Sequence, residues 1–272
     1  MNHILNITLS AGLCYCALAA GALFFSDYLI FPAPETSYEK DPDIFYLQLP
    51  EYGLSIACHY LPADNTKATI LYSHGNGEDL GHIRETLEFL NHLGFNVLAY
   101  EYPGYGQSKG DPSEANTYVA AQAAYDYLTT ELRTPAPCIY LYGRSLGGGP
   151  SVELARRNPV GGIILEGAFV SAFRVKTRWQ ILPWDKFENL KKLEALRCPV
   201  LVIHGTHDHT VPFWHGKALH DAAPQEKMKL WVEGAGHNNI IEAAGLAYQE
   251  TLLAFTTKKY GKKRSCISTP RL

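Results

Sequence analysis

The segment that decides the fold is Leu141-Tyr142-Gly143-Arg144-Ser145-Leu146-Gly147. It follows an apolar run typical of a buried strand and precedes a predicted helix over about 150–157. A serine two residues from glycine on each side, between a strand and a helix, is the pattern of a nucleophile elbow, a turn that only small flanking residues permit. We therefore predict that Ser145 projects above a sheet edge as a nucleophile. The alternative is a tight glycine turn with an idle serine.

An unassisted serine hydroxyl is a poor nucleophile, so the site needs a general base. Of the 11 histidines, His237 lies in a glycine-rich loop directly after the last predicted strand. Asp208 follows the preceding strand, which gives the chain order Ser145, Asp208, His237 that accompanies such an elbow. We predict a triad in which Asp208 fixes the tautomer of His237. The alternatives are a surface histidine at 237 and a helix N-cap at 208.

Acyl transfer also needs two hydrogen-bond donors for the developing oxyanion. We assign them to the backbone N–H of Leu146 and the backbone N–H of Asn76, which lies in the loop after the third predicted strand. We expect His74 in that loop to be a structural hydrogen-bonding residue. Alternating histidines over residues 204–209 could suggest a metal site, but the triad already accounts for that loop. We expect no metal and no cofactor.

The body of the chain alternates strands and helices from Ile44 onward. Eight strands are predicted, over residues 44–49, 54–60, 68–72, 96–100, 139–142, 162–165, 200–203 and 228–232. The later strands are continuous apolar runs, as in strands buried on both faces of a parallel sheet. We predict an α/β fold with a mostly parallel eight-stranded sheet, an antiparallel start and helices on both faces. This domain should occupy residues 35–258, and its last helix residues 240–256.

One connection, over residues 169–196, is too long for an ordinary link between a strand and the next one. We predict a small lid there. Its apolar side chains could receive an acyl chain or form the core of a small cap. The pocket candidates are Phe169, Phe173, Trp179 and Trp184.

The N-terminus carries no charged side chain between Ile4 and Phe25. At ~1.5 Å per residue, a helix over this run would cross a bilayer core of ~30 Å. We predict that residues 1–34 form a membrane anchor and linker, and the flanking charges mildly favour the body outside. A cleaved signal peptide is the alternative. Because the first strand begins at Ile44, residues 1–34 should contribute nothing to the core. We expect the basic tail, residues 259–272, to be solvated.

Composition excludes several classes of protein. Hydrophobic residues make up 46% of the 272 residues and charged residues 19%, so the body is not disordered. The net charge of −3 argues against nucleic acid as a partner. The sequence also lacks the glycine fingerprint that a nicotinamide-dependent enzyme would need after its first strand.

Together these motifs resemble the α/β-hydrolase superfamily, and within it the animal α/β-hydrolase-domain depalmitoylases and their membrane-associated relatives. The similar stretches are residues 71–76 with 79–81, 102–106 with 108, 141–147, 202–206 with 208 and 215–216, and 230–238. The resemblance implies a serine hydrolase that cleaves acyl esters or thioesters. Its substrate would be an acylated small molecule, a lipid or a lipidated protein.

Other functions stay open beside this one. Related sequences include lysophospholipases and general carboxylesterases, and a non-catalytic binding module is a further alternative. The depalmitoylases carry an acylated cysteine-rich segment at the N-terminus, where this chain has an apolar span with only Cys14 and Cys16. The implied membrane contact is therefore through an N-terminal helix.

Overall fold

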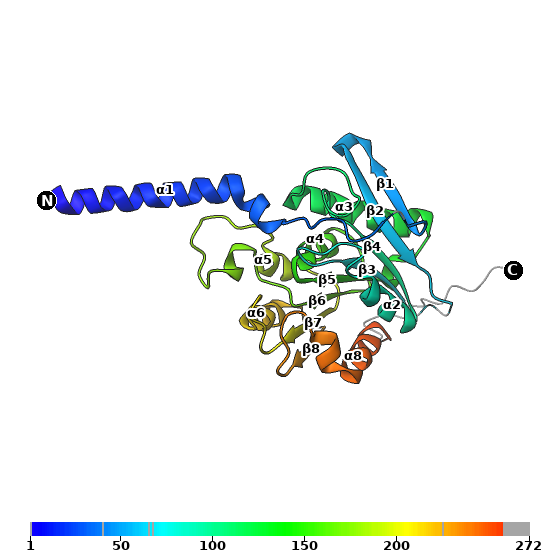
Figure 1. The fold of residues 1–272 in the computed structure, drawn as a ribbon. Coiled ribbons are helices and arrows are strands. Elements are labelled where there is room, and N and C mark those ends of the chain that lie inside the picture. Colours follow the sequence, from blue (N-terminus) through cyan, green and yellow to red (C-terminus); the bar gives the residue numbers. More distant parts are fainter. Residues whose placement is uncertain (1, 40, 65, 67, 225, 258–272) are drawn as a thin grey trace.

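A single eight-stranded sheet forms the centre of the protein (Figure 1). The computed structural model describes residues 2–39, 41–64, 66, 68–224 and 226–257; the expected basic tail lies outside them. The strands are β1 (Ile44–Leu49), β2 (Leu54–Leu61), β3 (Ala68–Ser73), β4 (Phe95–Tyr100), β5 (Ile139–Arg144), β6 (Gly162–Glu166), β7 (Val200–Gly205) and β8 (Lys227–Val232). Their order across the sheet is β1-β2-β4-β3-β5-β6-β7-β8.

The pairing confirms the predicted fold class. β2 runs antiparallel to both β1 and β4, and every other pair is parallel. β3 and β7 are buried along their whole length, as expected for strands covered on both faces. The carboxyl ends of β3, β5, β6, β7 and β8 therefore meet at one edge of the sheet.

Helices cover both faces of the sheet. They are α2 (Arg84–His92), α3 (Glu114–Asp126), α4 (Gly148–Arg157), α5 (Asn189–Leu193), α6 (Trp214–Ala222), α7 (Ile240–Ala244) and α8 (Leu246–Thr257). Apolar residues of α3, α4 and α6 share one core cluster, and those of α2, α7 and α8 share the other. The single helix expected over residues 240–256 is wrong, because Gly245 breaks it with φ +52°, a value in the region that favours glycine.

The N-terminal helix α1 (Asn2–Ile30) extends away from the body (Figure 1). Its stretch Asn6–Ile30 has a mean hydropathy of 1.8, long and apolar enough to cross a membrane, although a signal sequence would meet the same criteria. Phe31 follows directly and is only 4% exposed, with its ring against those of Tyr105 and Phe187. The expectation that residues 1–34 contribute nothing to the core is therefore wrong, because burying an aromatic side chain removes a large apolar area from water.

The long connection between β6 and β7 contains little regular structure beyond α5. Glu153 on α4 ties it to the body, with a carboxylate oxygen 3.0 Å from the Lys192 ammonium. The same carboxylate pairs with Arg156 and Arg157 on its own helix. Burial raises the pKa of Glu153, but these hydrogen bonds and charges outweigh it and lower the pKa to about 2.

Candidate active site

The turn after β5 has the sharp geometry that the sequence predicts. Ser145 has φ +50°, an uncommon and strained value for a residue with a side chain. A Cβ added to Gly147 would lie 2.0 Å from the Ser73 carbonyl oxygen, and one added to Gly143 would lie 2.5 Å from that of Gly147. Both glycines are therefore sterically required, and the turn holds Ser145 at the start of the helical segment that leads into α4.

The structure brings Asp208 and His237 together from the loops after β7 and β8. Asp208 Oδ2 lies 2.7 Å from His237 Nδ1. The other carboxylate oxygen accepts hydrogen bonds from the backbone N–H of Thr210 at 2.9 Å and of Val211 at 2.7 Å. Burial raises the pKa of Asp208, but the hydrogen bond and charge of His237 and the Val211 N–H outweigh it, so the pKa lies below its ordinary value. The carboxylate is thus ionised and held in one orientation.

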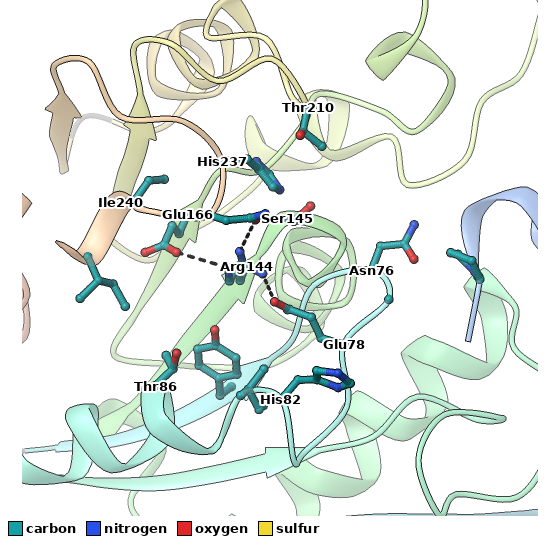
Figure 2. A pocket seen from close by; sticks show the side chains of 16 residues that line it. Asn76, Glu78, His82, Thr86, Arg144, Ser145, Glu166, Thr210, His237 and Ile240 are labelled. Carbon is teal, nitrogen blue, oxygen red and sulfur yellow. Dashed lines mark hydrogen bonds and ion pairs between the residues drawn. The ribbon is translucent and has the colours of Figure 1, made fainter. Parts of the chain in front are cut away.

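The imidazole of His237 also depends on Gly167, a residue that sequence analysis missed. Gly167 follows β6 with φ +56°, and a Cβ there would lie 3.0 Å from His237 Cε1. Its signal in the sequence is weak, since a glycine after a strand occurs in many turns. His237 and Ser145 line one cavity of about 610 Å³ (Figure 2).

The charged part of this cavity comes from Arg144 in the elbow itself. Its guanidinium pairs with Glu78, lies 3.6 Å from Glu166 through Nε, and donates to the Asn238 side chain at 2.8 Å (Figure 2). Sequence analysis did not find this cluster, because its members come from four separate segments. The cavity on this side of Ser145 is therefore polar and charged.

The two residues assigned to the oxyanion hole lie beside Ser145. Register pairs Ser73 of β3 with Gly143 of β5, so the loop that carries Asn76 starts next to the elbow. Asn76 and Leu146 line a second cavity together with Ser145. That the two backbone N–H groups form an oxyanion hole stays a prediction.

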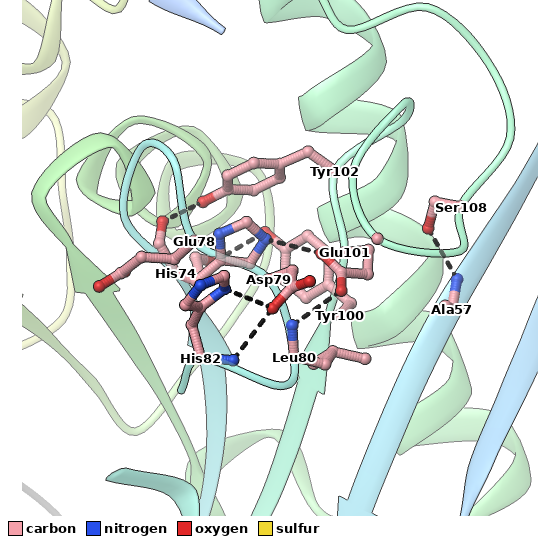
Figure 3. Close-up of polar contacts among 12 residues, drawn as sticks. Ala57, His74, Glu78, Asp79, Leu80, His82, Tyr100, Glu101, Tyr102 and Ser108 are labelled. Carbon is pink, nitrogen blue, oxygen red and sulfur yellow. Dashed lines mark hydrogen bonds and ion pairs between the residues drawn. The ribbon is translucent and has the colours of Figure 1, made fainter. Parts of the chain in front are cut away.

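A buried polar network fixes the loop that carries Asn76 (Figure 3). His74 Nε2 lies 3.3 Å from a carboxylate oxygen of Glu101, and both side chains are fully buried. The other oxygen of Glu101 accepts the backbone N–H of Leu80 at 2.8 Å, and the Tyr102 hydroxyl donates to the His74 carbonyl at 2.5 Å. Burial lowers the pKa of His74, but its contact with Glu101 outweighs this and raises the pKa. His74 has a structural role here, as expected, and sequence analysis missed Glu101.

The second cavity, of about 840 Å³, is predominantly apolar. It lies between the elbow and the connection over residues 169–196, and all four candidate pocket residues line it: Phe169, Phe173, Trp179 and Trp184. Residues of α1 line it as well, which was not expected from the sequence. Among the described residues, no group of three or more His, Cys, Asp or Glu side chains could hold a metal ion.

Comparisons with known proteins agree with this fold. Residues 64–189 match the family described as serine aminopeptidase S33, and residues 173–263 match the prolyl oligopeptidase family. Among solved structures, the esterase Pf2001 of Pyrococcus furiosus has a TM-score of 0.68 at 16% identity. That alignment covers 82% of this chain and 97% of the esterase; at this identity it shows the fold alone.

Closer relatives identify the group. The α/β-hydrolase domain-containing protein aho-3 of Caenorhabditis elegans is 41% identical over 74% of this chain and 61% of its own length. The α/β-hydrolase domain-containing protein 17B of Xenopus tropicalis is 37% identical over 82% of this chain and 78% of its own length. The chain therefore belongs to the α/β-hydrolase domain-containing protein 17 family, within the serine hydrolases of the α/β-hydrolase superfamily.

Proposed function

We propose that this protein hydrolyses acyl esters or thioesters through Ser145, Asp208 and His237. The observation that carries the proposal is the hydrogen bond of 2.7 Å between Asp208 and His237, formed at the cavity that Ser145 enters from a strained turn. The pair, distant in sequence, supports a catalytic triad because His237 lines the same cavity as Ser145, an arrangement that has no evident use in a binding module.

The reaction follows from these positions. Ser145 Oγ attacks the acyl carbonyl, and His237 takes its proton through Nε2 while Asp208 stabilises the resulting imidazolium. The backbone N–H groups of Leu146 and Asn76 donate to the oxyanion. His237 then protonates the leaving alkoxide or thiolate, and a water molecule, activated in turn by His237, hydrolyses the acyl-enzyme.

The two cavities at Ser145 support an amphiphilic substrate. The apolar cavity suits the acyl chain, and the cavity that holds Arg144, Glu78 and Glu166 suits a polar leaving group. The resemblance to depalmitoylases favours a thioester of a lipidated protein. Lysophospholipids and simple carboxylic esters fit the same division. We further propose that α1 anchors the protein to a membrane as a single span.

Covalent labelling with a fluorophosphonate tests the nucleophile. Wild-type protein should be labelled, and Ser145→Ala should lose both labelling and ester hydrolysis, by a factor on the order of 10⁶. Ser171→Ala is the matched control, because Ser171 is also buried but lines neither cavity. More than a tenth of the activity remaining in a folded Ser145→Ala variant would overturn the assignment.

A substrate panel then decides the class. Hexadecanoyl thioesters, lysophospholipids and p-nitrophenyl esters of graded length should be compared by kcat/KM. A preference for the thioester of a peptide supports protein depalmitoylation, whereas a preference for the lysophospholipid supports the lipase alternative.

A further inference from the structure

We infer that α1 is a wall of the acyl-binding cavity as well as an anchor, and that a long acyl chain enters this cavity directly from the membrane. The inference rests on the proposed function of Ser145 and adds to it the class of acyl group and its route. It concerns the cavity of about 840 Å³ that lies between α1, the elbow and the lid. The lid is the connection over residues 169–196.

One face of α1 lines the cavity. The residues that contribute are Leu18, Gly21, Ala22, Phe25, Ser26, Leu29 and Ile30. They follow one another at alternating steps of three and one, the spacing of a single helix face. Of the residues between them, Ala20, Leu23, Phe24 and Tyr28 are exposed and line neither cavity, whereas Ala19 and Asp27 are half-buried. Leu18, Phe25 and Leu29 on the lining face are themselves more than half exposed. The helix is thus two-sided although both sides are apolar.

Polar contacts hold α1 against the lid, one before the lining stretch and one within it. The Tyr15 hydroxyl, one turn before Leu18, donates to the Ile181 carbonyl at 3.2 Å. Near the other end, the Lys186 ammonium lies 2.8 Å from the Asp27 carboxylate. These two contacts tie the α1 wall of the cavity to the lid.

The lining stretch is also part of the apolar span Asn6–Ile30. If this span lies in a bilayer, the side of the cavity formed by Leu18 to Ile30 is at membrane depth. Beside it the lid exposes two large apolar side chains, Trp179 at 76% and Ile181 at 50%, and a bilayer would remove their apolar area from water. An acyl chain could then pass from the bilayer to the cavity without exposing its methylene groups to water.

The inner end of the cavity reaches the reaction centre. Ser145 and Leu146 line the same cavity as the α1 residues. A chain that lies along α1 therefore presents its carbonyl carbon to the Ser145 hydroxyl. The volume lies within the range of ~300–1,000 Å³ that ligand pockets span, which leaves space for a long chain.

A pair of matched substitutions in α1 tests the inference. Ala22→Trp places a large side chain in the cavity, and Ala20→Trp places the same side chain on the outward surface of the same helix. Both keep the helix apolar. The full-length protein in lipid vesicles should be assayed with hexadecanoyl and acetyl thioesters of the same thiol.

Ala22→Trp should lower kcat/KM for the hexadecanoyl thioester at least tenfold, and by at least fivefold more than it lowers kcat/KM for the acetyl thioester. Ala20→Trp should change neither. Normal hexadecanoyl hydrolysis by Ala22→Trp would overturn the inference. In that case a catalytically dead Ser145→Ala would show that the proposed function still stands, whereas an active Ser145→Ala would show that the proposed function itself has failed.

A second pair covers the case in which Ala22→Trp loses both activities. A Cβ at Gly21 and one at Gly12 would each meet nothing within 4 Å, but only Gly21 lines the cavity. Gly21→Leu should slow the hexadecanoyl thioester selectively, and Gly12→Leu should not. Equal effects of Gly21→Leu on both thioesters would overturn the inference.

Discussion

Asp208→Asn is the substitution whose effect follows most directly from the geometry. The backbone N–H groups of Thr210 and Val211 point at Asp208 Oδ1. In the variant, the amide oxygen must stay on these two donors, so the NH₂ group turns toward His237. It then donates to His237 Nδ1, where the wild-type carboxylate accepts.

This reversal forces the wrong tautomer on the imidazole. With Nδ1 as the acceptor, Nε2 carries the hydrogen and cannot take the proton of Ser145. The expected loss in kcat is ~10⁴-fold, which corresponds to about 5.5 kcal/mol of transition-state stabilisation at ~1.36 kcal/mol per factor of ten. The fold should persist, because both backbone hydrogen bonds survive.

The assay is hydrolysis of a p-nitrophenyl ester, with circular dichroism to confirm folding. Glu233→Gln is the control, since Glu233 is an exposed acid four residues before His237 on the same loop. It should retain full activity. An Asp208→Asn variant within tenfold of wild type, or an inactive Glu233→Gln, would refute the reasoning.

Three further outcomes are expected. Replacing Trp179 and Trp184 together by Ala should raise KM for long-chain esters more than KM for acetate esters, because up to ~0.8 kcal/mol of binding free energy is lost for each methylene that loses contact. An equal loss of activity on both esters would show that the two residues are structural. Phe31→Ala should cost about 3–5 kcal/mol and lower Tm by ~2–4 °C per kcal/mol, and calorimetry showing an unchanged Tm would contradict its core role. Because the pKa of Glu153 is lowered to about 2 in the folded protein, its ion pairs stabilise the fold above pH ~4.5 and no longer do so below about pH 2. The Tm difference between wild type and Glu153→Gln should therefore shrink as the pH falls through this range.

The sequence was most informative where the constraint is local. Gly143 and Gly147 are required by contacts within one turn, so their spacing around Ser145 was sufficient to predict the elbow. The strands could be predicted because each is a short apolar run that the sheet buries on both faces. Asp208 and His237 could be chosen from their order along the chain, since parallel strands deliver successive loops to one sheet edge.

The remaining features depend on contacts between distant segments. Glu101 looks like any acid after a strand until the fold places it against His74, 27 positions earlier in the numbering. Phe31 reads as the end of an apolar helix, and only the positions of Tyr105 and Phe187 make it a core residue. The lining of a cavity by α1 could not be predicted for the same reason.

The arrangement of the two cavities accounts for how an amphiphilic substrate would be oriented. Three residues line both cavities, Asn76, Ser145 and Thr210, so the cavities meet at Ser145. A charged leaving group would lose its hydration in the apolar cavity without gaining partners, at a cost of several kcal/mol. An acyl chain placed beside Arg144 and its carboxylates would gain little burial. For the proposed substrate, desolvation therefore favours the orientation that brings the carbonyl carbon to Ser145.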